Sequence, residues 1–432
     1  MALDVYREFQ GKLELVGGFT DAVQHDRMFE YDAAYLQQEN SHALSLSLPL
    51  SVKPYPHKRY APFFDGMIPE GPVRTELAHR FQIPVSDGLG LLERIGGECV
   101  GALMFLPHGM DPSVQKPSYR RLKQEDIDGL IAGEVVAMAT NMQESRLSLA
   151  GAQSKTGWLL PEGKDPKTAQ VEDWLAPEGS APSTHIIKVS APGHEDLPYN
   201  EHVCMEAASM CGLKTAKTWV PSFMPKALIS ERYDRIWLGD SRSIDGVRVP
   251  LRLHQEDFCQ ANGWPSYLKY ENDPYACYAR TCGNLIRETS SDAIADVRSF
   301  AMQLVFDYLV GNCDSHMKNH SLLFSPDWES KRLAPTYDVV CTTIMGYDHN
   351  LGIVIGDHRC IDEVAVEDLE LFAGDLGMSS RMFKRDCGQL VERFSRAFER
   401  LVSAGGNIGR VATQIVNDAQ ERLRVVRAFC AG

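Results

Sequence analysis

The residues with the clearest chemical potential lie in the stretch GNCDSHMKN (311–319), which follows the apolar segment FAMQLVFDYLV (300–310). Asp314 and Asn319 lie five positions apart in this stretch, and Asp338 follows beyond a predicted hairpin. Transfer of a phosphoryl group from ATP requires a carboxylate that orients the attacking hydroxyl and oxygen ligands that hold Mg²⁺ against the phosphates. Protein kinases carry an Asp and an Asn at this spacing in one loop, and a second metal-binding Asp follows. The pattern therefore predicts a catalytic loop for phosphoryl transfer.

Two other interpretations of this loop are open. Asp314 and His316 could bind a transition metal, and His320 lies close by, but no second His/Asp pair is placed to complete such a site. His316 could instead shape the loop by bonding its backbone, which is compatible with a kinase.

A kinase also needs a lysine that neutralises the α- and β-phosphates of ATP. Lys188 lies in the β-branched run HIIKV, which predicts a strand. A carboxylate on a helix often pairs with this lysine. The predicted helix over 200–213 offers Glu201 or Glu206 for that role.

The element that cradles the phosphates should precede the lysine, and the candidate is SLAGAQSKTG (148–157). Its small residues Ala150, Gly151 and Ala152 would let backbone N–H groups approach phosphate oxygens. The stretch matches neither the G-x-G-x-x-G nor the Walker pattern, and alone it indicates only a tight turn. The order of lysine strand, carboxylate helix, core helix, Asp-x4-Asn loop, hairpin and second Asp is that of a kinase.

The elements that must position these residues change in character along the chain. Short alternating runs such as ALSLSLPL (43–50) predict strands near the N-terminus, and 63–81 reads as a loop and a short helix with Pro72 in its first turn. A helix is expected at 124–140, and an exposed loop at 161–183. Further strands are predicted at 157–161, 184–190, 217–221 and 226–233. Helices are predicted at 292–311, where apolar residues form a wide stripe, and at 408–429.

We divide the chain into four parts on this basis. They are an N-terminal β-rich subdomain, a connector with a helix, a kinase N-lobe with the phosphate loop, and a helical C-lobe with the catalytic loop, over 1–110, 111–145, 146–240 and 241–432.

The composition limits the classes of protein to which the chain can belong. The 432 residues are 44% hydrophobic and 24% charged, which is typical of a globular protein with a large core. The net charge of −14 argues against a general nucleic-acid binder. The 11 cysteines include no C-x-x-C pair, so free thiols in a reducing compartment are expected. We see neither a signal peptide nor an apolar run of roughly 20 residues, and we expect a soluble, cytoplasmic protein without membrane contact.

Six stretches in this order resemble the HipA-type serine/threonine kinases, which are the toxins of bacterial HipBA toxin–antitoxin modules. They are SLAGAQSKT, HIIKVS, SERYDR, HQEDFCQANG, GNCDSHMKN and PTYDVV. The N-terminal stretches FFDGMIPEGPVR and LLERIGGECVGAL also resemble that family. The resemblance implies an α+β, protein-kinase-like two-lobe fold with an additional N-terminal β-rich subdomain and an all-helical C-lobe.

The resemblance also implies a role for individual residues. Asp314 would be the catalytic base, Asn319 and Asp338 would bind Mg²⁺, and Ser148 would be an inhibitory autophosphorylation site. A phosphate at this serine would place nearly two negative charges where the phosphates of ATP should bind. The remaining residues of the implied ATP site are Ala150, Gly151, Ala152, Gln153, Ser154, Lys155, Lys188, Glu231, Arg232, Tyr233, His316, Lys318 and Tyr337.

The partners implied by the resemblance are a protein substrate and an antitoxin. Family members are expected to phosphorylate glutamyl-tRNA synthetase, which halts growth and leads to persistence. A HipB-type helix-turn-helix antitoxin dimer would bind the chain and regulate transcription at operator DNA. The antitoxin would supply the cationic surface for that DNA, which fits the acidic charge of this chain.

The stretch HQEDFCQANG (254–263) permits two interpretations. His254, Glu256 and Asp257 could open a helix, since acidic side chains are favoured near its positive end. A substrate or nucleotide role is the alternative.

Two alternative functions belong to other classes. The chain could be a catalytically inactive co-repressor that acts with its antitoxin, or a small-molecule kinase of the aminoglycoside type. The joint presence of Lys188, Asp314, Asn319 and Asp338 argues against the first, and the N-terminal β-rich part argues against the second.

Overall fold

The computed structural model describes most of the chain and divides it into two units. The described residues are 3–20, 27–112, 116–131, 139–140, 142–143, 145–151, 153, 155–190, 193–239 and 242–432. Unit 1 comprises Met1–Gly193, Trp219–Ser266 and Leu323–Glu329, and unit 2 comprises His194–Thr218, Tyr267–Leu322 and Ser330–Gly432.

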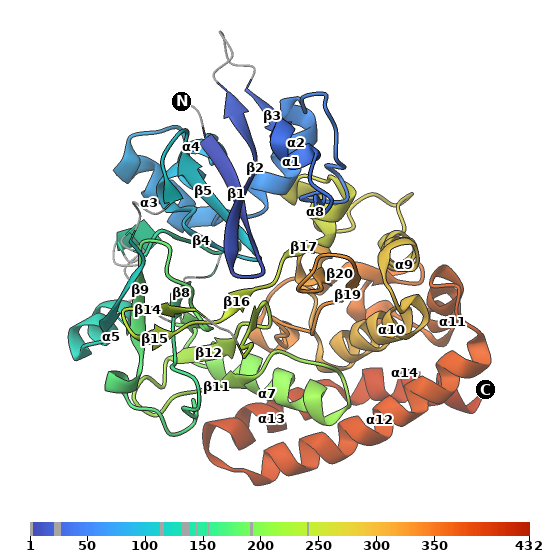
Figure 1. The fold of residues 1–432 in the computed structure, drawn as a ribbon. Coiled ribbons are helices and arrows are strands. Elements are labelled where there is room, and N and C mark those ends of the chain that lie inside the picture. The colour runs from blue at the N-terminus through green and yellow to red at the C-terminus, as the bar shows by residue number, and fades with distance from the viewer. Residues whose placement is uncertain are drawn as a thin grey trace. The chain divides into compact units, whose positions relative to one another are not determined.

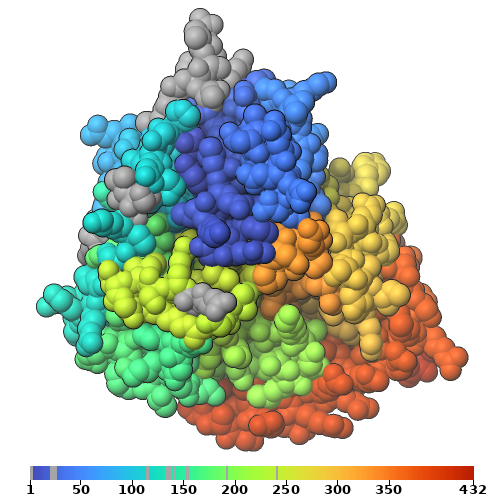
Figure 2. All heavy atoms as spheres, in the orientation of Figure 1, coloured from blue at the N-terminus to red at the C-terminus, as the bar shows by residue number. Residues whose placement is uncertain are grey.

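The N-terminal part of unit 1 is an antiparallel sheet covered by helices (Figure 1). The strand order is β3-β2-β1-β5. The strands are β1 (Leu3–Phe9), β2 (Lys12–Thr20), β3 (Met28–Tyr31) and β5 (Leu103–Pro107). The helices are α1 (Ala33–Leu36), α2 (His57–Asp65), α3 (Gly71–Phe81) and α4 (Gly88–Ile95). Figure 2 shows atoms of this part, coloured from blue to cyan, on the face turned to the viewer.

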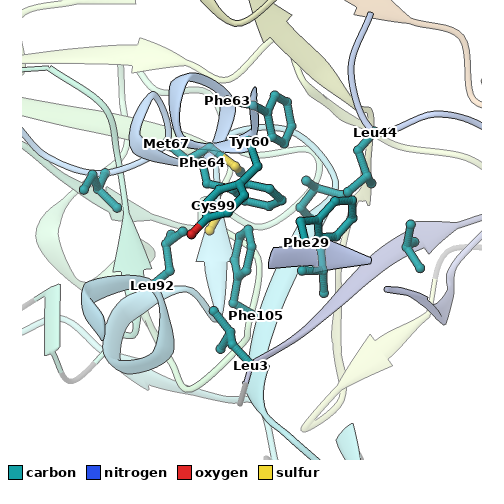
Figure 3. Packing of buried hydrophobic residues seen from close by; sticks show 14 of the residues in the cluster. Leu3, Phe29, Leu44, Tyr60, Phe63, Phe64, Met67, Leu92, Cys99 and Phe105 are labelled. Atoms are coloured by element: carbon teal, nitrogen blue, oxygen red, sulfur yellow. The ribbon is translucent and has the colours of Figure 1, made fainter. Parts of the chain in front are cut away.

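Aromatic rings fill the core between this sheet and α2. Phe64 of α2 contacts Phe29 of β3 and Phe105 of β5, with ring centroids 5.3 and 5.9 Å apart. Figure 3 shows these rings together with Tyr60 and Met67. All five side chains are at most 3% exposed, and burial of such rings is the main term that holds helix and sheet together.

A second antiparallel sheet in unit 1 has the order β11-β12-β10-β8. Its strands are β8 (Lys155–Trp158), β10 (His185–Val189), β11 (Thr218–Trp219) and β12 (Ala227–Glu231). The other strands are short, namely β4 (Glu98–Cys99), β6 (Ser118–Arg121), β7 (Leu147–Ser148), β9 (Leu175–Glu178), β13 (Arg235–Ile236), β14 (Ser243–Ile244), β15 (Val247–Arg248), β16 (Leu251–Arg252) and β17 (Gln255–Asp257). The helices are α5 (Gln124–Ile131), α8 (Phe258–Asn262) and a 3-10 turn at Val171–Asp173, and a further 3-10 turn at Ser266–Leu268 begins in unit 1 and ends in unit 2.

Unit 2 is mainly helical. Its helices are α7 (Leu197–Met210), α9 (Tyr278–Thr289), α10 (Ala293–Val310), α11 (Val366–Asp375), α12 (Ser380–Ser403), α13 (Gly406–Asp418) and α14 (Gln420–Ala431). Helix α12 packs against α7, α13 and α14 (Figure 1). Its strands are β18 (Ser321–Phe324, which ends in unit 1), β19 (Lys331–Leu333), β20 (Asn350–Ile355) and β21 (His358–Cys360). Short 3-10 turns lie at Met317–Asn319, Thr343–Met345 and Ile361–Glu363.

Several predicted elements are confirmed. Helix α10 lies within the predicted range 292–311, Asp292 caps its start, and Gly311 ends it with a φ of 79°. Helix α7 and strands β10 and β12 lie at their predicted places, and Pro72 lies in the first turn of α3. The helix expected at 124–140 is present as α5, and residues 132–138 of that range lie outside the described residues.

Three expected elements are wrong. The stretch 161–183 is not a plain exposed loop, because Trp174 is fully buried there and the following β9 pairs with β6. The range 408–429 contains two helices, α13 and α14, each with its own buried apolar face. The run ALSLSLPL forms no strand, because the Tyr31 hydroxyl accepts from the Leu44 N–H and donates to the Leu48 carbonyl.

No helix among the described residues is both long and apolar enough to cross a membrane.

Candidate active site

The catalytic loop (residues 311–320) begins where α10 ends. Gly311 adopts a left-handed conformation, and a Cβ atom there would come within 2.2 Å of Thr343 Oγ1. Only glycine therefore permits the close approach and the turn at this point. The Asn312 N–H donates to the Asp307 carbonyl at 2.8 Å, which completes the helix end. The loop thus leaves α10 in a defined direction.

Asp314 is the one exposed residue of the catalytic loop, and the other nine are buried. The loop closes around its main chain, because the Asn319 side-chain amide donates to the Asp314 carbonyl at 2.9 Å and the His316 N–H donates to it at 2.9 Å. The Asn312 side chain accepts from the Asp314 N–H at 3.1 Å. A rigid, buried loop therefore presents a single carboxylate to the outside.

Asp307, which our sequence analysis did not single out, anchors this loop from α10. Its carboxylate accepts from Asn312 Nδ2 at 2.9 Å and from Ser315 Oγ at 2.7 Å. Burial raises the pKa of Asp307 to about 7, although these two hydrogen bonds act in the opposite direction. An aspartate at the end of an apolar stripe was the available signal, since charges are rarely fully buried without a purpose.

This raised pKa predicts a pH-dependent stability. The unfolded chain releases the Asp307 proton near pH 4, whereas the folded protein holds it up to about pH 7, so stability falls as the pH rises between these values. Relative to Asp307→Asn, which cannot ionise, the unfolding free energy of the wild type should fall by about 1–3 kcal/mol between pH 5 and pH 8. Urea denaturation followed by far-UV circular dichroism measures this. Parallel pH curves for the two proteins would contradict the assignment.

The two histidines of the loop are neutral and buried. Burial and the nearby Lys269 lower the pKa of His316 to about 3, and burial lowers that of His320 to about 3. Among the described residues, no three His, Cys, Asp or Glu side chains gather as metal ligands, so the transition-metal interpretation has no ligand set. The His316 ring packs edge-on against Tyr270, with centroids 5.0 Å apart.

Asp338 and Tyr337 follow β19 in unit 2. Asp338 has a φ of 60°, which non-glycine residues rarely adopt and which is often found at functional sites. The Tyr337 hydroxyl lies 2.8 Å from Ser321 Oγ and donates to the Lys318 carbonyl at 2.8 Å. Asp338 also acts electrostatically on His316 of the catalytic loop. The structure thus brings the loop and the segment of Asp338 together.

The phosphate loop (residues 148–155) lies in unit 1. Gly151 has a φ of 101°, and its carbonyl accepts from the Glu70 N–H at 3.0 Å. Lys155 Nζ donates to the Ala150 carbonyl at 2.7 Å. Gln153 is partly exposed, and the predicted Ala152 and Ser154 lie outside the described residues. Ser148 is fully buried, and its hydroxyl donates to the Met67 carbonyl at 2.9 Å.

Lys188 lies directly opposite Lys155 on neighbouring strands β10 and β8. Residues paired in this way point to the same face of a sheet, and like charges at such positions repel. Both side chains are less than 10% exposed. Two buried ammonium groups on one face are the arrangement that an anion such as a phosphate stabilises.

The segment Glu231–Tyr233 has two partly exposed side chains on either side of a buried one. Glu231 and Tyr233 are partly exposed. The Arg232 guanidinium is buried and bonds to Glu98 at 2.9 Å and to Asp234 at 2.8 Å. Its backbone N–H donates to the Thr184 carbonyl at 2.9 Å. The side chain of Arg232 therefore has a structural role within unit 1.

Glu201 and Glu206, the two candidate partners of Lys188, differ in burial. On α7 of unit 2, Glu201 is 2% exposed, whereas Glu206 is only partly buried. Asn200, next to Glu201, donates to the Cys341 carbonyl at 2.9 Å and accepts from its N–H at 2.8 Å. These bonds tie α7 to the chain that follows Asp338, within unit 2.

In the stretch HQEDFCQANG (254–263), His254, Glu256 and Asp257 have structural roles. Asp257 caps α8 and forms a capping box with Gln260, as the helix-opening interpretation predicts. The Glu256 carboxylate accepts from Ser45 Oγ at 2.5 Å. The buried His254 ring stacks on Trp328, with centroids 4.3 Å apart.

The chain is similar to known proteins over most of its length. A model of the HipA-like C-terminal domain matches residues 147–402, and a model of the HipA N-terminal domain matches residues 11–106. The kinase-like protein Y4mE of Sinorhizobium fredii is 31% identical over 397 residues, which cover 90% of each chain. The serine/threonine-protein kinase toxin HipA of Shewanella oneidensis is 26% identical over 79% of this chain and 76% of its own.

A solved structure matches this chain over its full length. It is a chain in the complex of HipA, HipB and operator DNA from Shewanella oneidensis MR-1, with a TM-score of 0.79 and 22% identity, and the match covers 100% of this chain and 99% of that chain. This similarity shows an α+β, kinase-like fold, as the sequence predicts.

Proposed function

This chain belongs to the HipA family, and on that premise we propose that it is an ATP-dependent serine/threonine protein kinase. The observation that carries the proposal is the exposure of Asp314 in a loop whose other nine residues are buried. A base for phosphoryl transfer must be accessible to the hydroxyl of the acceptor and must be held in one orientation. Asp314 meets both requirements.

In the proposed reaction, the hydroxyl oxygen of the acceptor attacks the γ-phosphorus of ATP, and ADP leaves. The Asp314 carboxylate orients the hydroxyl and receives its proton. The phosphate loop, Lys155 and Lys188 bind the phosphates, and Glu231 and Tyr233 hold adenine through backbone groups. Lys318, His316 and Tyr337 support the loop that carries the base.

Asn319 and Asp338 are the residues that would hold Mg²⁺, since amide and carboxylate oxygens suit this ion. The ion would neutralise negative charge on the phosphates. Both residues lie in unit 2, Asn319 is part of the catalytic loop, and Asp338 acts electrostatically on His316 of the same loop. The donor set therefore fits the ion.

The proposal is tested by incubating the protein with ATP and Mg²⁺ and measuring ADP formation and intact mass. We expect ADP and a gain of phosphate on protein. Calorimetry without detectable ATP binding would instead support a catalytically inactive co-repressor. Phosphate on a small alcohol such as an aminoglycoside, but on no protein, would support a small-molecule kinase.

Ser148 is the proposed site of inhibitory autophosphorylation. Its hydroxyl is fully buried and bonded to the Met67 carbonyl, so a phosphate at this position cannot remain where the serine now lies. We expect phosphatase-treated wild type to gain one phosphate and then lose most of its ADP-forming activity. Ser148→Ala should gain none at this position and keep its activity for longer, as peptide mass spectrometry and ADP release measure.

Ser222→Ala is the matched control for this prediction, because Ser222 is an exposed serine of the same unit. It should behave as wild type. Inactivation of Ser148→Ala at the wild-type rate would show that another site is responsible.

The proposed biological role is that of the toxin of a type II toxin–antitoxin pair. The matched solved complex contains HipA, HipB and operator DNA, which supports a HipB-type partner for this chain. We expect that partner to be a helix-turn-helix antitoxin that makes most of the DNA contacts, as the family resemblance implies. Co-expression with a helix-turn-helix protein encoded next to its gene, followed by gel filtration and operator gel shift, tests this. Absence of a complex would contradict it.

Glutamyl-tRNA synthetase is the proposed substrate, on the basis of the family resemblance. Incubation of the purified synthetase from the same organism with the protein, ATP and Mg²⁺ should add phosphate to the synthetase and stop its aminoacylation. An unmodified synthetase, together with autophosphorylated kinase, would direct the search to another substrate.

A further inference from the structure

Tyr270 makes a contact with the proposed base that the reaction described above does not use. Its hydroxyl donates a hydrogen bond to Asp314 Oδ1 at 2.5 Å. Both residues lie in unit 2 and are 44 positions apart. Asp314 is the exposed member of a buried loop, so this hydrogen bond reaches the carboxylate that the acceptor would meet.

The chain on either side of Tyr270 is fixed against the catalytic loop. On one side, the Lys269 carbonyl accepts from the Met317 N–H at 3.1 Å. On the other side, the Glu271 N–H donates to the Gly352 carbonyl at 2.9 Å. A Cβ atom at Gly352 would come within 2.6 Å of the Ser315 carbonyl oxygen, so this strand approaches the loop closely. The backbone of Tyr270 therefore cannot move independently of the loop.

The side chain of Glu271 adds a second anchor. Glu271 is 6% exposed, and its carboxylate accepts from the Tyr278 N–H at 3.0 Å and from the Val354 N–H at 2.8 Å. These bonds connect the segment to the start of α9 and to β20. Main-chain and side-chain hydrogen bonds thus hold the segment Lys269–Glu271 to the catalytic loop, to α9 and to β20.

The ring of Tyr270 is fixed as well. It packs edge-on against His316, with centroids 5.0 Å apart, and Lys269 Nζ lies 5.4 Å from its centroid. His316 is buried in the catalytic loop, so the ring rests on the same rigid body that carries Asp314. The hydroxyl consequently reaches the carboxylate from a fixed point.

We infer that Tyr270 is a positioning residue for the base: its hydroxyl holds one oxygen of the Asp314 carboxylate, so that the other oxygen is directed at the hydroxyl of the acceptor. This inference rests on the proposed function, because it concerns the same reaction. A hydrogen bond to a charged group is worth more than a neutral one, and a misdirected catalytic group loses rate without a loss of ATP binding.

The test compares Tyr270→Phe with wild type at rising ATP concentrations, with initial ADP formation as the readout. The Phe variant keeps the ring against His316 and removes only the hydroxyl. We expect the maximal rate to fall about tenfold, while the ATP concentration at half-maximal rate and the melting temperature stay unchanged. Tyr267→Phe is the matched control, because Tyr267 lies three residues before Tyr270 in the chain but is 78% exposed.

Three results would overturn the inference. An unchanged rate would show that the hydroxyl does not position the base, and a higher rate would show that it occupies the place of the acceptor. If only the ATP concentration at half-maximal rate changed, Tyr270 would be assigned to nucleotide binding. Failure of the proposed function is recognised separately, since then the wild type itself would form no ADP.

Discussion

Replacement of Asp314 by asparagine is expected to lower the initial rate of ADP formation by about a thousandfold, because general base catalysis typically contributes a factor of this order. Asparagine keeps the shape of the side chain and can still accept the hydrogen bond from Tyr270, but it cannot receive the proton of the acceptor. ATP affinity should change little, since the proposed phosphate and metal ligands are other residues. ADP release measures the rate, and calorimetry measures ATP binding.

The control for this variant is Glu288→Gln, which removes an exposed carboxylate of α9 in the same unit. It should form ADP at the wild-type rate. If Asp314→Asn keeps most of the activity, Asp314 is not the base. If both variants and the wild type form no ADP and calorimetry detects no ATP binding, the chain is a binding module.

The parts of the site that could be predicted from sequence are those that depend on neighbours along the chain. The apolar stripe and Gly311 predict both α10 and its end, and the loop with Asp314 and Asn319 follows directly. Chain order could then place Asp338 beyond the hairpin, and the structure shows that its segment approaches the loop. The residue types within one stretch and the order of elements along the chain are enough to predict such residues.

Other parts of the site depend on tertiary packing. Tyr270 reaches Asp314 across 44 positions, and nothing near it in the sequence marks it among 15 tyrosines. The burial of Asp307 follows from the packing of α10, and without that packing an aspartate at a helix end looks like a surface residue. Arg232 is the clearest case, since its partner Glu98 lies 134 positions earlier.

The wrong predictions of elements have the same origin. The stretch 161–183 is rich in residues that favour loops, and yet Trp174 enters a core formed with distant residues such as Trp158 and Ile187. The leucines of ALSLSLPL alternate as in a strand, but a single tyrosine hydroxyl binds the backbone groups that a neighbouring strand would bind. Alternation and propensity describe one segment, whereas burial and bonding are decided by its neighbours.

Glu98 lies at the centre of a buried ionic cluster in unit 1, and its loss is expected to have the largest effect on stability. Its carboxylate contacts Arg232 at 2.9 Å, Arg235 at 2.8 Å and Arg252 at 2.6 Å, and all four side chains are at most 1% exposed. Burial would raise the pKa of Glu98, but the three guanidinium groups hold it below its usual range. Asp234 and Glu8 supply the other two negative charges, so three buried anions balance three buried cations.

Glu98→Gln keeps the shape of the side chain and leaves three guanidinium groups with two carboxylates. Removal of one member of a buried ionic cluster leaves an uncompensated charge, so unit 1 should lose about 3–5 kcal/mol of unfolding free energy. Tryptophan fluorescence during urea denaturation measures this loss specifically, because all six tryptophans lie in unit 1.

Glu76→Gln is the control. The Glu76–Arg80 pair of α3 is partly exposed, with 3.8 Å between the charged groups, and should contribute less than about 1 kcal/mol. Equal effects of the two variants would show that the cluster does not stabilise unit 1 and that apolar packing, such as that around Phe64, is sufficient.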